Sequence, residues 1–399
     1  MTQPLDGVTV ADFTTAHQGP WATQKLGDLG AEVIKVERYE GEWARDLTVG
    51  GDRYVDGASP FWLSANRSKR SINLDLKTEG GHEVALDLVS EADVVVENFR
   101  PGVMDRLGLG YEDVREVNPE VVYVSASGFG SDGPYADRPG QDLLMQAVSG
   151  IASSVGRRDD PPLPVPFPIV DGHAAMQIAL HAMVALFHRE RTGEGQRVEV
   201  NLLDAAVDSQ CQAFTVECNM DDDFERSEAG IGQKYLPAPY GIYETADGYA
   251  AIAMTPLDRL AAVLDCPDLM EYAPYEERDE VKRRLEAHTR ERETEELVET
   301  LVDADVWAAA VNDFAAAADH PQIQHNDMLV DVAHPDPDAE AFETTGIPAS
   351  FSATEAEIDR GPPRVGEHAE EILRELGYDD DLIADLVAAE VTGRPGEKV

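Results

Sequence analysis

Several features are scarce or missing in this chain. Its three cysteines, Cys211, Cys218 and Cys266, form neither a metal-ligand spacing nor an even set for disulfides. No uninterrupted apolar run approaches the roughly 20 residues of a membrane span, and the N-terminus lacks the basic and apolar pattern of a signal peptide. We therefore expect a cytoplasmic protein with no metal site and no membrane partner.

Positive charge is also scarce. Lysine and arginine together number 32, against 78 acidic residues, which gives a net charge of -46 over 399 residues. The acidity is spread along the chain and accompanies 43% apolar residues, so the composition predicts a folded protein. Such a chain repels itself in dilute buffer and needs salt for screening. This favours the high-salt cytosol of a halophile and disfavours nucleic acid as a partner.

The opening of the chain predicts a β-α-β unit. An apolar, β-rich segment at 8–13 is followed by a helical pattern at 21–29 and a second strand pattern at 31–37. Further strand patterns at 92–97 and 121–127 alternate with helices, which indicates a parallel sheet. The loop from Thr14 to Pro20 then lies at the carboxyl end of the first strand, where such sheets bind ligands. No G-x-G-x-x-G motif is present, so a dinucleotide site is not supported.

The domain organisation follows from changes in composition. We predict a large Rossmann-like α/β domain over 1–224, a smaller α+β domain over 225–320, and a C-terminal segment, 321–399, that returns to the large domain. The middle region contains a hairpin pattern with the turn Ala246-Asp247-Gly248. The fold class is therefore α/β with two domains.

Asp171 is the first candidate for chemistry. The segment Pro164-Val-Pro-Phe-Pro168 forces an extended entry, and a helical pattern follows from His173 to His188. Asp171 is expected to cap that helix, with its carboxylate ionised by backbone N–H groups and the helix dipole. A purely capping role remains the alternative.

Cations gather at predicted strand ends. The stretch 66–77, Asn-Arg-Ser-Lys-Arg-Ser-Ile-Asn-Leu-Asp-Leu-Lys, is the densest positive cluster of the chain. Asn98-Phe99-Arg100 follows another strand, and Arg106 lies in the next helical segment. In so acidic a chain these side chains suggest a bound anion, although a solvated basic turn remains possible.

These segments resemble the class III CoA-transferases, the formyl-CoA transferase and carnitine CoA-transferase family that also includes the α-methylacyl-CoA racemases. The resemblance implies an interlocked homodimer, acyl-CoA and a small carboxylic acid as substrates, and no metal or cofactor beyond CoA itself. It assigns Asp171 as the catalytic residue and Gln18 as the glutamine that holds the acyl group. The CoA contacts it implies are Arg38, Leu74, Asp75, Leu76, Lys77, Asn98, Phe99, Arg100 and Arg106.

One departure bears on the reaction. The racemases carry a histidine before an aspartate in a segment that here reads Gly140-Gln141-Asp142. Racemisation needs a second base, which glutamine cannot supply. This favours a transferase over a racemase using another base, such as His173 or Glu217. A non-catalytic CoA-binding protein is the remaining alternative.

The resemblance implies covalent catalysis through an aspartyl-CoA thioester. A polar pocket formed by His17, Gln18, Gln141 and Asp142 suits a short or dicarboxylic acid. Succinyl-CoA is the expected donor and mesaconate a possible acceptor. His17 has an alternative interpretation as a structural hydrogen-bonding residue.

Overall fold

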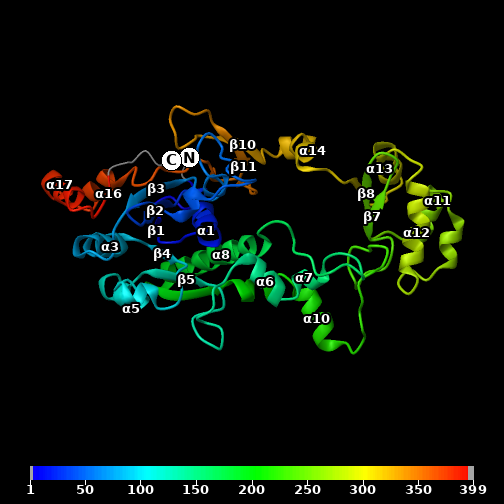
Figure 1. Ribbon diagram of the computed structural model, residues 1–399, viewed down its shortest axis with the longest axis horizontal. Coiled ribbons are helices and arrows are strands. Elements are labelled where there is room, and N and C mark those ends of the chain that lie inside the picture. Colours follow the sequence, from blue (N-terminus) through cyan, green and yellow to red (C-terminus); the bar gives the residue numbers. More distant parts are fainter. Residues whose placement is uncertain (1–2, 394–399) are drawn as a thin grey trace. The chain divides into compact units, whose positions relative to one another are not determined.

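The computed structural model describes residues 3–393 (Figure 1). Its strands are β1 (Thr9–Asp12), β2 (Glu32–Glu37), β3 (Lys69–Asn73), β4 (Val94–Glu97), β5 (Val122–Ser127), β6 (Gln196–Asn201), β7 (Gly241–Glu244), β8 (Tyr249–Ile252), β9 (Ala308–Ala310), β10 (Leu329–Val332) and β11 (Phe342–Thr345). Its helices are α1 (Gln18–Gly27), η1 (Trp43–Asp46), α2 (Pro60–Leu63), α3 (Glu79–Glu91), α4 (Val103–Arg106), α5 (Tyr111–Val117), α6 (Asp142–Val148), α7 (Ile151–Ser154), α8 (Ile169–Thr192), α9 (Leu202–Asp208), α10 (Cys211–Asn219), α11 (Leu257–Val263), η2 (Pro267–Glu271), α12 (Arg278–Thr289), α13 (Thr294–Asp303), α14 (Phe314–Ala318), α15 (Pro321–His325), α16 (Ala369–Glu375) and α17 (Asp380–Ala388).

The chain divides into two compact units. The first comprises the described residues up to Met145, together with Pro168–Ser209 and those from Gln322 onward. The second comprises Gln146–Phe167 and Gln210–Pro321. The boundary predicted at 224 falls inside this second unit, which also takes up the segment before α8.

A six-stranded parallel sheet organises the first unit. Its strand order is β3-β2-β1-β4-β5-β6, with every neighbouring pair parallel. The strands read as valine-rich runs because helices cover both faces of the sheet. The predicted Rossmann-like α/β class is confirmed, and the order reverses between β1 and β4.

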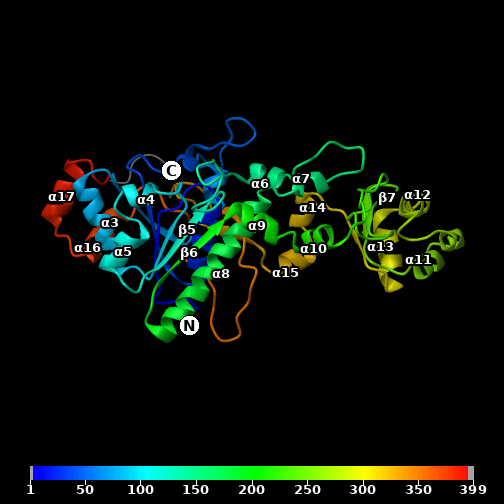
Figure 2. The ribbon, with the colours of Figure 1, turned by 90° about the horizontal axis from the view of Figure 1, so that it is seen from below.

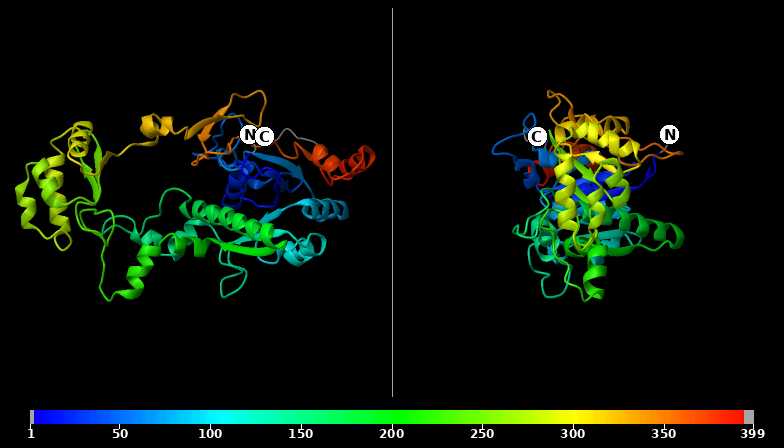
Figure 3. Two further views of the ribbon diagram at one scale, coloured as in Figure 1. Left: turned by 180° about the vertical axis from the view of Figure 1, so that it is seen from behind. Right: turned by 90° about the vertical axis from the view of Figure 1, so that its right-hand side faces the viewer.

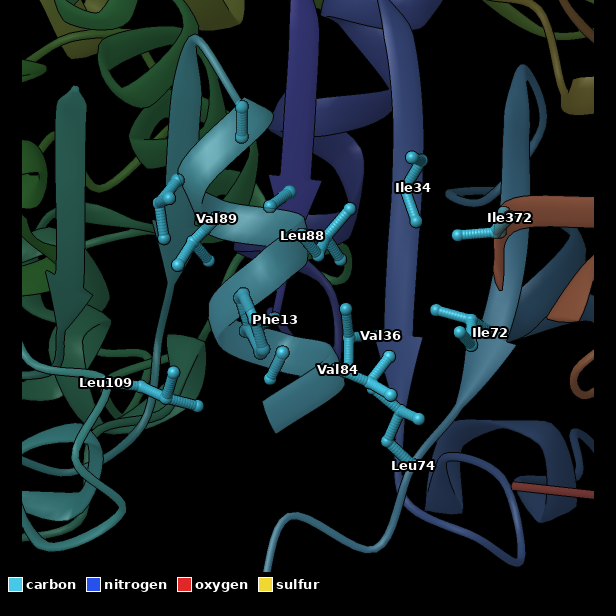
Figure 4. Close-up of a cluster of buried hydrophobic side chains, with 14 of the residues drawn as sticks. Phe13, Ile34, Val36, Ile72, Leu74, Val84, Leu88, Val89, Leu109 and Ile372 are labelled. Carbon is cyan, nitrogen blue, oxygen red and sulfur yellow. The ribbon is translucent and has the colours of Figure 1, made fainter. Parts of the chain in front are cut away.

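One face of the sheet is covered by α3, α5, α16 and α17 (Figures 1 and 2). In Figure 4, Val84 and Leu88 of α3 point toward Phe13 and Val36 at the strands. Ile372 of α16 belongs to the same cluster, so the C-terminal segment completes the core that the N-terminal strands begin.

The other face is covered by α1 and α8. Ala175, Ile178, Ala182 and Leu186 recur along one side of α8 and are buried against the sheet. α8 is also long and apolar enough to cross a membrane, by length and composition only. One such helix is weak evidence, because core helices pass the same test.

The second unit contains the antiparallel sheet β7-β8-β9, in which β7 and β8 form the predicted hairpin and β9 pairs with β8. Its helices α11, α12 and α13, yellow in Figure 3, pack on one side of this sheet and share its core. Tyr243, Leu260, Leu285 and Leu301 are fully buried there. The unit therefore has a hydrophobic core of its own.

Candidate active site

The loops after β1 and β4 are joined to each other at the point where the strand order reverses. Asn98, just after β4, accepts the Thr15 N–H at 2.7 Å and donates to the Thr15 carbonyl at 2.8 Å. Open α/β sheets bind ligands at this position, outside the carboxyl ends of the strands. Asn98 therefore fixes the shape of the crevice through its contacts with Thr15.

Buried charged side chains hold the loop that follows β1 in place. Lys35 of β2 donates to the Thr14 carbonyl at 2.7 Å and pairs with Glu42 at 2.9 Å. Glu42 also accepts the N–H of Ala16, whose φ of 67° lies in the left-handed region. Glycine is required at Gly19, because a Cβ there would collide with the Thr14 side chain. These contacts fix where α1 begins.

His17 and Gln18 are presented by this loop. His17 lies between the rings of Trp21 and Phe61, with centroids 5.2 and 5.0 Å away. Burial lowers the pKa of His17 to about 4, against an opposing effect of the Asp142 charge, so the imidazole is neutral at pH 7. Within residues 3–393, neither His17 Nδ1 nor Gln18 Nε2 has a hydrogen-bond partner, although both atoms are buried. Buried polar atoms without partners are costly and indicate a ligand position.

Asp171 is the third residue of α8, and the expectation that it caps the helix is wrong. Pro168 occupies the cap position, and the capping acceptor comes from Asp142. Its Oδ2 accepts the N–H groups of Val170 at 2.7 Å and Asp171 at 3.0 Å. The backbone donors expected to hold the Asp171 carboxylate are thereby taken by another acid.

The Asp171 carboxyl has a raised pKa. Burial is the first cause and the nearby Asp142 charge the second, and together they raise the pKa of Asp171 to about 7. Within the described residues its carboxyl accepts no hydrogen bond that would stabilise the ionised form. The side chain is therefore only partly ionised at neutral pH, in contrast to the expectation of a fully ionised carboxylate, and is correspondingly more basic than an ordinary aspartate.

Asp171 lines a hollow of about 240 Å³. The wall carries donors and cations around one acid, and all of its residues belong to the first unit. The polar side chains in this wall are Thr15, His17, Gln18, Asn98, Arg100, Ser127, Arg138, Gln141 and Asp171. We call it the acyl hollow.

A second hollow of about 650 Å³ adjoins the first, since both are lined by Thr15 and Phe99. Arg38 and Lys77 line it, and neither forms an ion pair with a carboxylate of the described chain. Exposed cations that no carboxylate neutralises suit phosphate groups. We call it the cation-lined hollow.

The structure thus brings most of the predicted residues into two connected hollows. The acyl hollow contains Gln18, His17, Gln141, Asp171, Asn98 and Arg100, and the cation-lined hollow contains Arg38, Leu74, Asp75, Leu76 and Lys77, with Phe99 between them. Arg106 lines neither hollow. Asp142 lies behind the wall, capping α8.

Two site residues were missed by sequence reasoning. Thr15 links the hollows, and Arg138 adds a guanidinium to the acyl hollow. The available signal for Arg138 was a single cation in the loop Ser131-Asp-Gly-Pro-Tyr-Ala-Asp-Arg-Pro139. Thr15 lies in the loop from Thr14 to Pro20 that was predicted to bind a ligand, but its pairing with the distant Asn98 has no local sequence signal.

The two alternative racemase bases, His173 and Glu217, both have hydrogen-bonding partners of their own. His173 Nε2 lies 2.9 Å from Asp208 Oδ2, and His173 does not line the acyl hollow. Glu217 belongs to the second unit, where it accepts the Tyr235 hydroxyl at 2.7 Å and pairs with Lys234. His173 is therefore not positioned as a base in the acyl hollow, and Glu217 does not belong to the unit that contains Asp171.

One group of potential metal ligands exists among the described residues: Cys266, Asp268 and His288. Burial, followed by the hydrogen bond to Asp268, raises the pKa of the Cys266 thiol to about 11, and Asp268 also pairs with Arg284 at 3.0 Å. Metals bind the thiolate, so these atoms are poorly prepared to bind one.

Known proteins resemble this chain over nearly its whole length. A model of CoA-transferase family III matches residues 5–369. A succinyl-CoA:mesaconate CoA-transferase of Haloarcula hispanica is 34% identical over 388 residues, covering 94% of this chain and 96% of that protein. A succinyl-CoA:glutarate CoA-transferase of Homo sapiens is 31% identical over 400 residues, covering 98% and 90%.

The architecture is shared with a solved structure as well. The crystal structure of a CAIB/BAIF family protein from Brucella suis matches with a TM-score of 0.82 and 31% identity, covering 94% of this chain and all of that one. The resemblance therefore extends to the three-dimensional fold of both units.

Proposed function

Because the chain belongs to CoA-transferase family III, we propose that it transfers CoA from succinyl-CoA to a short dicarboxylic acid through a covalent intermediate on Asp171. Mesaconate is the acceptor we favour. Relatives whose names include succinyl-CoA support the donor. The observation that carries the proposal is the half-buried Asp171, which lines a hollow that joins the cation-lined hollow.

The reaction we propose has four balanced steps. The Asp171 carboxylate attacks the thioester carbonyl of succinyl-CoA, giving a mixed anhydride and the CoA thiolate. The thiolate attacks the aspartyl carbonyl, which releases succinate and leaves an aspartyl-CoA thioester. The acceptor carboxylate attacks this thioester and releases the thiolate again. The thiolate then attacks the acceptor carbonyl, which yields the new acyl-CoA and free Asp171.

The surroundings suit these steps. A carboxylate with a pKa near 7 is more nucleophilic than an ordinary one and still partly ionised at neutral pH. The unpartnered Gln18 amide can donate to the oxygen that becomes negative during each attack. In this scheme CoA is a substrate, and neither a metal nor another cofactor takes part.

The route of oxygen atoms tests this proposal. Each turnover removes one Asp171 oxygen with the departing acid and replaces it with one from the acceptor. After a single turnover with ¹⁸O-labelled mesaconate, mass spectrometry should find the label in the peptide that contains Asp171. Hydroxylamine should also trap that side chain in the presence of succinyl-CoA. Product formation with unlabelled Asp171 would refute the intermediate.

A racemase is separated from a transferase by proton exchange. Gln141 lines the acyl hollow where a racemase would need a base. In deuterated solvent, a branched acyl-CoA should therefore gain no deuterium at its α-carbon. A CoA-binding protein without catalysis would give neither the label nor the hydroxylamine adduct.

We also propose that the active form is a homodimer. Met176, Leu180, Val184 and Phe187 form an exposed apolar stripe along α8, with exposures of 41 to 63%. A second copy is the occupant we favour over an anionic membrane, which would repel a chain of charge -46. Leu180→Glu should convert dimers to monomers in light scattering. For interlocked subunits, tagged and untagged dimers should not exchange chains without denaturant.

The acidic composition supports a cytoplasmic protein that works in high salt. With 78 acidic and 32 basic residues, like charges repel throughout the molecule unless ions screen them. Activity and compactness should therefore both rise from dilute buffer to molar KCl. A protein equally active in dilute buffer would contradict this environment.

A further inference from the structure

Arg138 stands out among the cations of the acyl hollow. It lies in the loop between β5 and α6 and lines the same hollow as Gln18 and Asp171. No assignment made above gives it a role. Arg100, the other guanidinium of this wall, also lines a further hollow of about 570 Å³.

The guanidinium of Arg138 is held without a carboxylate. Among residues 3–393 it forms no ion pair, in a chain with 78 acidic side chains. Its Cζ instead lies 3.7 Å from the ring centroid of Tyr135, and the backbone N–H of Arg138 donates to the Tyr135 carbonyl at 2.9 Å. Stacking holds the plane of the group and leaves its edge N–H donors free. Arg158, by comparison, pairs with Glu228 at 2.7 Å.

The hollow therefore presents two kinds of donor. The amide of Gln18 is neutral and buried, which suits the polarised oxygen at the reacting carbon. The guanidinium of Arg138 is charged and exposed to the hollow, which suits a full carboxylate bound through two parallel hydrogen bonds. A dicarboxylic acyl group carries both features, one at each end of a short chain.

We propose that Arg138 binds the distal carboxylate of the acyl group and so makes the enzyme select dicarboxylic over monocarboxylic acids. This inference rests on the proposed function, since it concerns the acid that reacts at Asp171. It assigns Arg138 to specificity, while the cation-lined hollow holds CoA for every acyl group. The alternative role for Arg138, a contact with CoA itself, is an outcome of the test.

The test compares donors that differ only at the distal end. Wild type, Arg138→Gln and Arg138→Lys are assayed with succinyl-CoA and butyryl-CoA, using one acceptor. Arg138→Gln should lower kcat/KM for succinyl-CoA by about 10- to 100-fold, the range for a lost charged hydrogen bond. Butyryl-CoA should be unaffected. Arg138→Lys should retain part of the preference for succinyl-CoA over butyryl-CoA, because lysine keeps the charge but lacks the two parallel N–H donors of the guanidinium.

Three further variants sharpen the result. Tyr135→Leu keeps the charge and removes the ring beneath it, so it should weaken the preference less than Arg138→Gln does. Arg100→Gln should affect both donors alike. Arg115, exposed and 3.6 Å from Glu112, provides a matched control whose glutamine variant should change nothing.

Two outcomes would overturn the inference. Equal losses for both donors, with weaker binding of free CoA by calorimetry, would make Arg138 a CoA contact. An unchanged preference in Arg138→Gln would remove it from specificity altogether. If wild type fails to exchange CoA at all, the proposed function fails, and competition between succinate and butyrate for binding still tests Arg138 independently.

Discussion

Asp12 and Asp171 belong to the same unit and have opposite surroundings. Asp12, at the end of β1, is fully buried, pairs with Lys69 at 3.0 Å and accepts hydroxyl hydrogen bonds from Thr14 and Thr23. Asp171 is also largely shielded from water, but among residues 3–393 no cation acts to lower its pKa, and the one charge that shifts it is that of Asp142.

The difference appears directly in the two pKa values. Burial alone would raise both. At Asp12 burial is the largest single effect, but the charges of Lys69 and Lys35 and the hydroxyl hydrogen bonds from Thr14 and Thr23 together outweigh it and lower the pKa to about 2. At Asp171 the Asp142 charge acts in the same direction as burial, and the pKa rises to about 7. A carboxylate satisfied by its partners supports the fold, whereas one left unsatisfied is available for chemistry, at a cost in stability.

Replacing Asp171 should produce the largest effect. Asp171→Asn is expected to lower CoA transfer by about four orders of magnitude, the scale for loss of a catalytic nucleophile. The free energy of unfolding should not fall, because burial already disfavours the charge. Paired measurements of exchange rate and denaturation midpoint check this.

The matched control is Asp208→Asn, an exposed carboxylate of the same unit that contacts His173. It should change the exchange rate by no more than a few-fold. More than one per cent of wild-type activity in Asp171→Asn would contradict the catalytic assignment.

Replacing Asp12 should have the opposite effect, with a large loss of stability and no loss of the chemistry at Asp171. Asp12→Ala leaves the Lys69 ammonium buried without its carboxylate, which is expected to lower the free energy of unfolding by about 3–5 kcal/mol. Because the folded pKa of Asp12 lies below 3.8, the stability it provides is present above that pH and declines as pH falls toward about 2. Denaturant titration in molar KCl measures both.

The fraction that remains folded should still form the hydroxylamine adduct at Asp171. Glu112→Ala, at an exposed ion pair, is the control and should shift stability by less than about 1 kcal/mol. A variant of Asp12 that is fully stable yet inactive would break the comparison.

Gln18 offers a smaller effect on rate alone. Gln18→Leu removes a buried amide whose Nε2 has no partner among the described residues, so folding loses little. The loss of one donor to a developing oxyanion should lower kcat by about 10²-fold with CoA affinity unchanged. Gln177→Leu, on α8 outside the acyl hollow, is the control. An unchanged kcat would remove Gln18 from the reaction.

Much of the parallel sheet could be predicted from the sequence. Buried strands in a parallel sheet read as apolar runs, so β1, β2, β4 and β5 could be predicted close to their observed bounds. The positions of Asp171 and Gln18 came from the resemblance.

The chemistry at Asp171 could not be predicted in the same way. Capping by Asp142 joins residues 29 positions apart, and a local pattern favours the nearest acid as cap. The raised pKa depends on burial and on that distant charge, neither of which has a sequence signature.

The smallest expected effect concerns pH. Since Asp171 must be ionised to attack, kcat/KM for succinyl-CoA should fall as pH decreases through about 7. Asp142→Asn removes the like charge but keeps an oxygen that can accept the α8 N–H groups. The acid limb of the pH profile, where kcat/KM falls, should then move to lower pH. Its apparent pKa should stay above 3.8, because burial, the larger cause of the shift, is unchanged.

Glu97 is the control for this assignment, since burial also raises its pKa to about 7 and it lines a different hollow from Asp171. Glu97→Gln retains an acceptor for the Phe99 N–H, which the native side chain holds at 3.0 Å, and should leave the limb where it is. His17 stays neutral above about pH 4 and contributes nothing near 7. If Glu97→Gln shifts the pH at which kcat/KM falls and Asp142→Asn does not, Asp171 is not the group that titrates during catalysis.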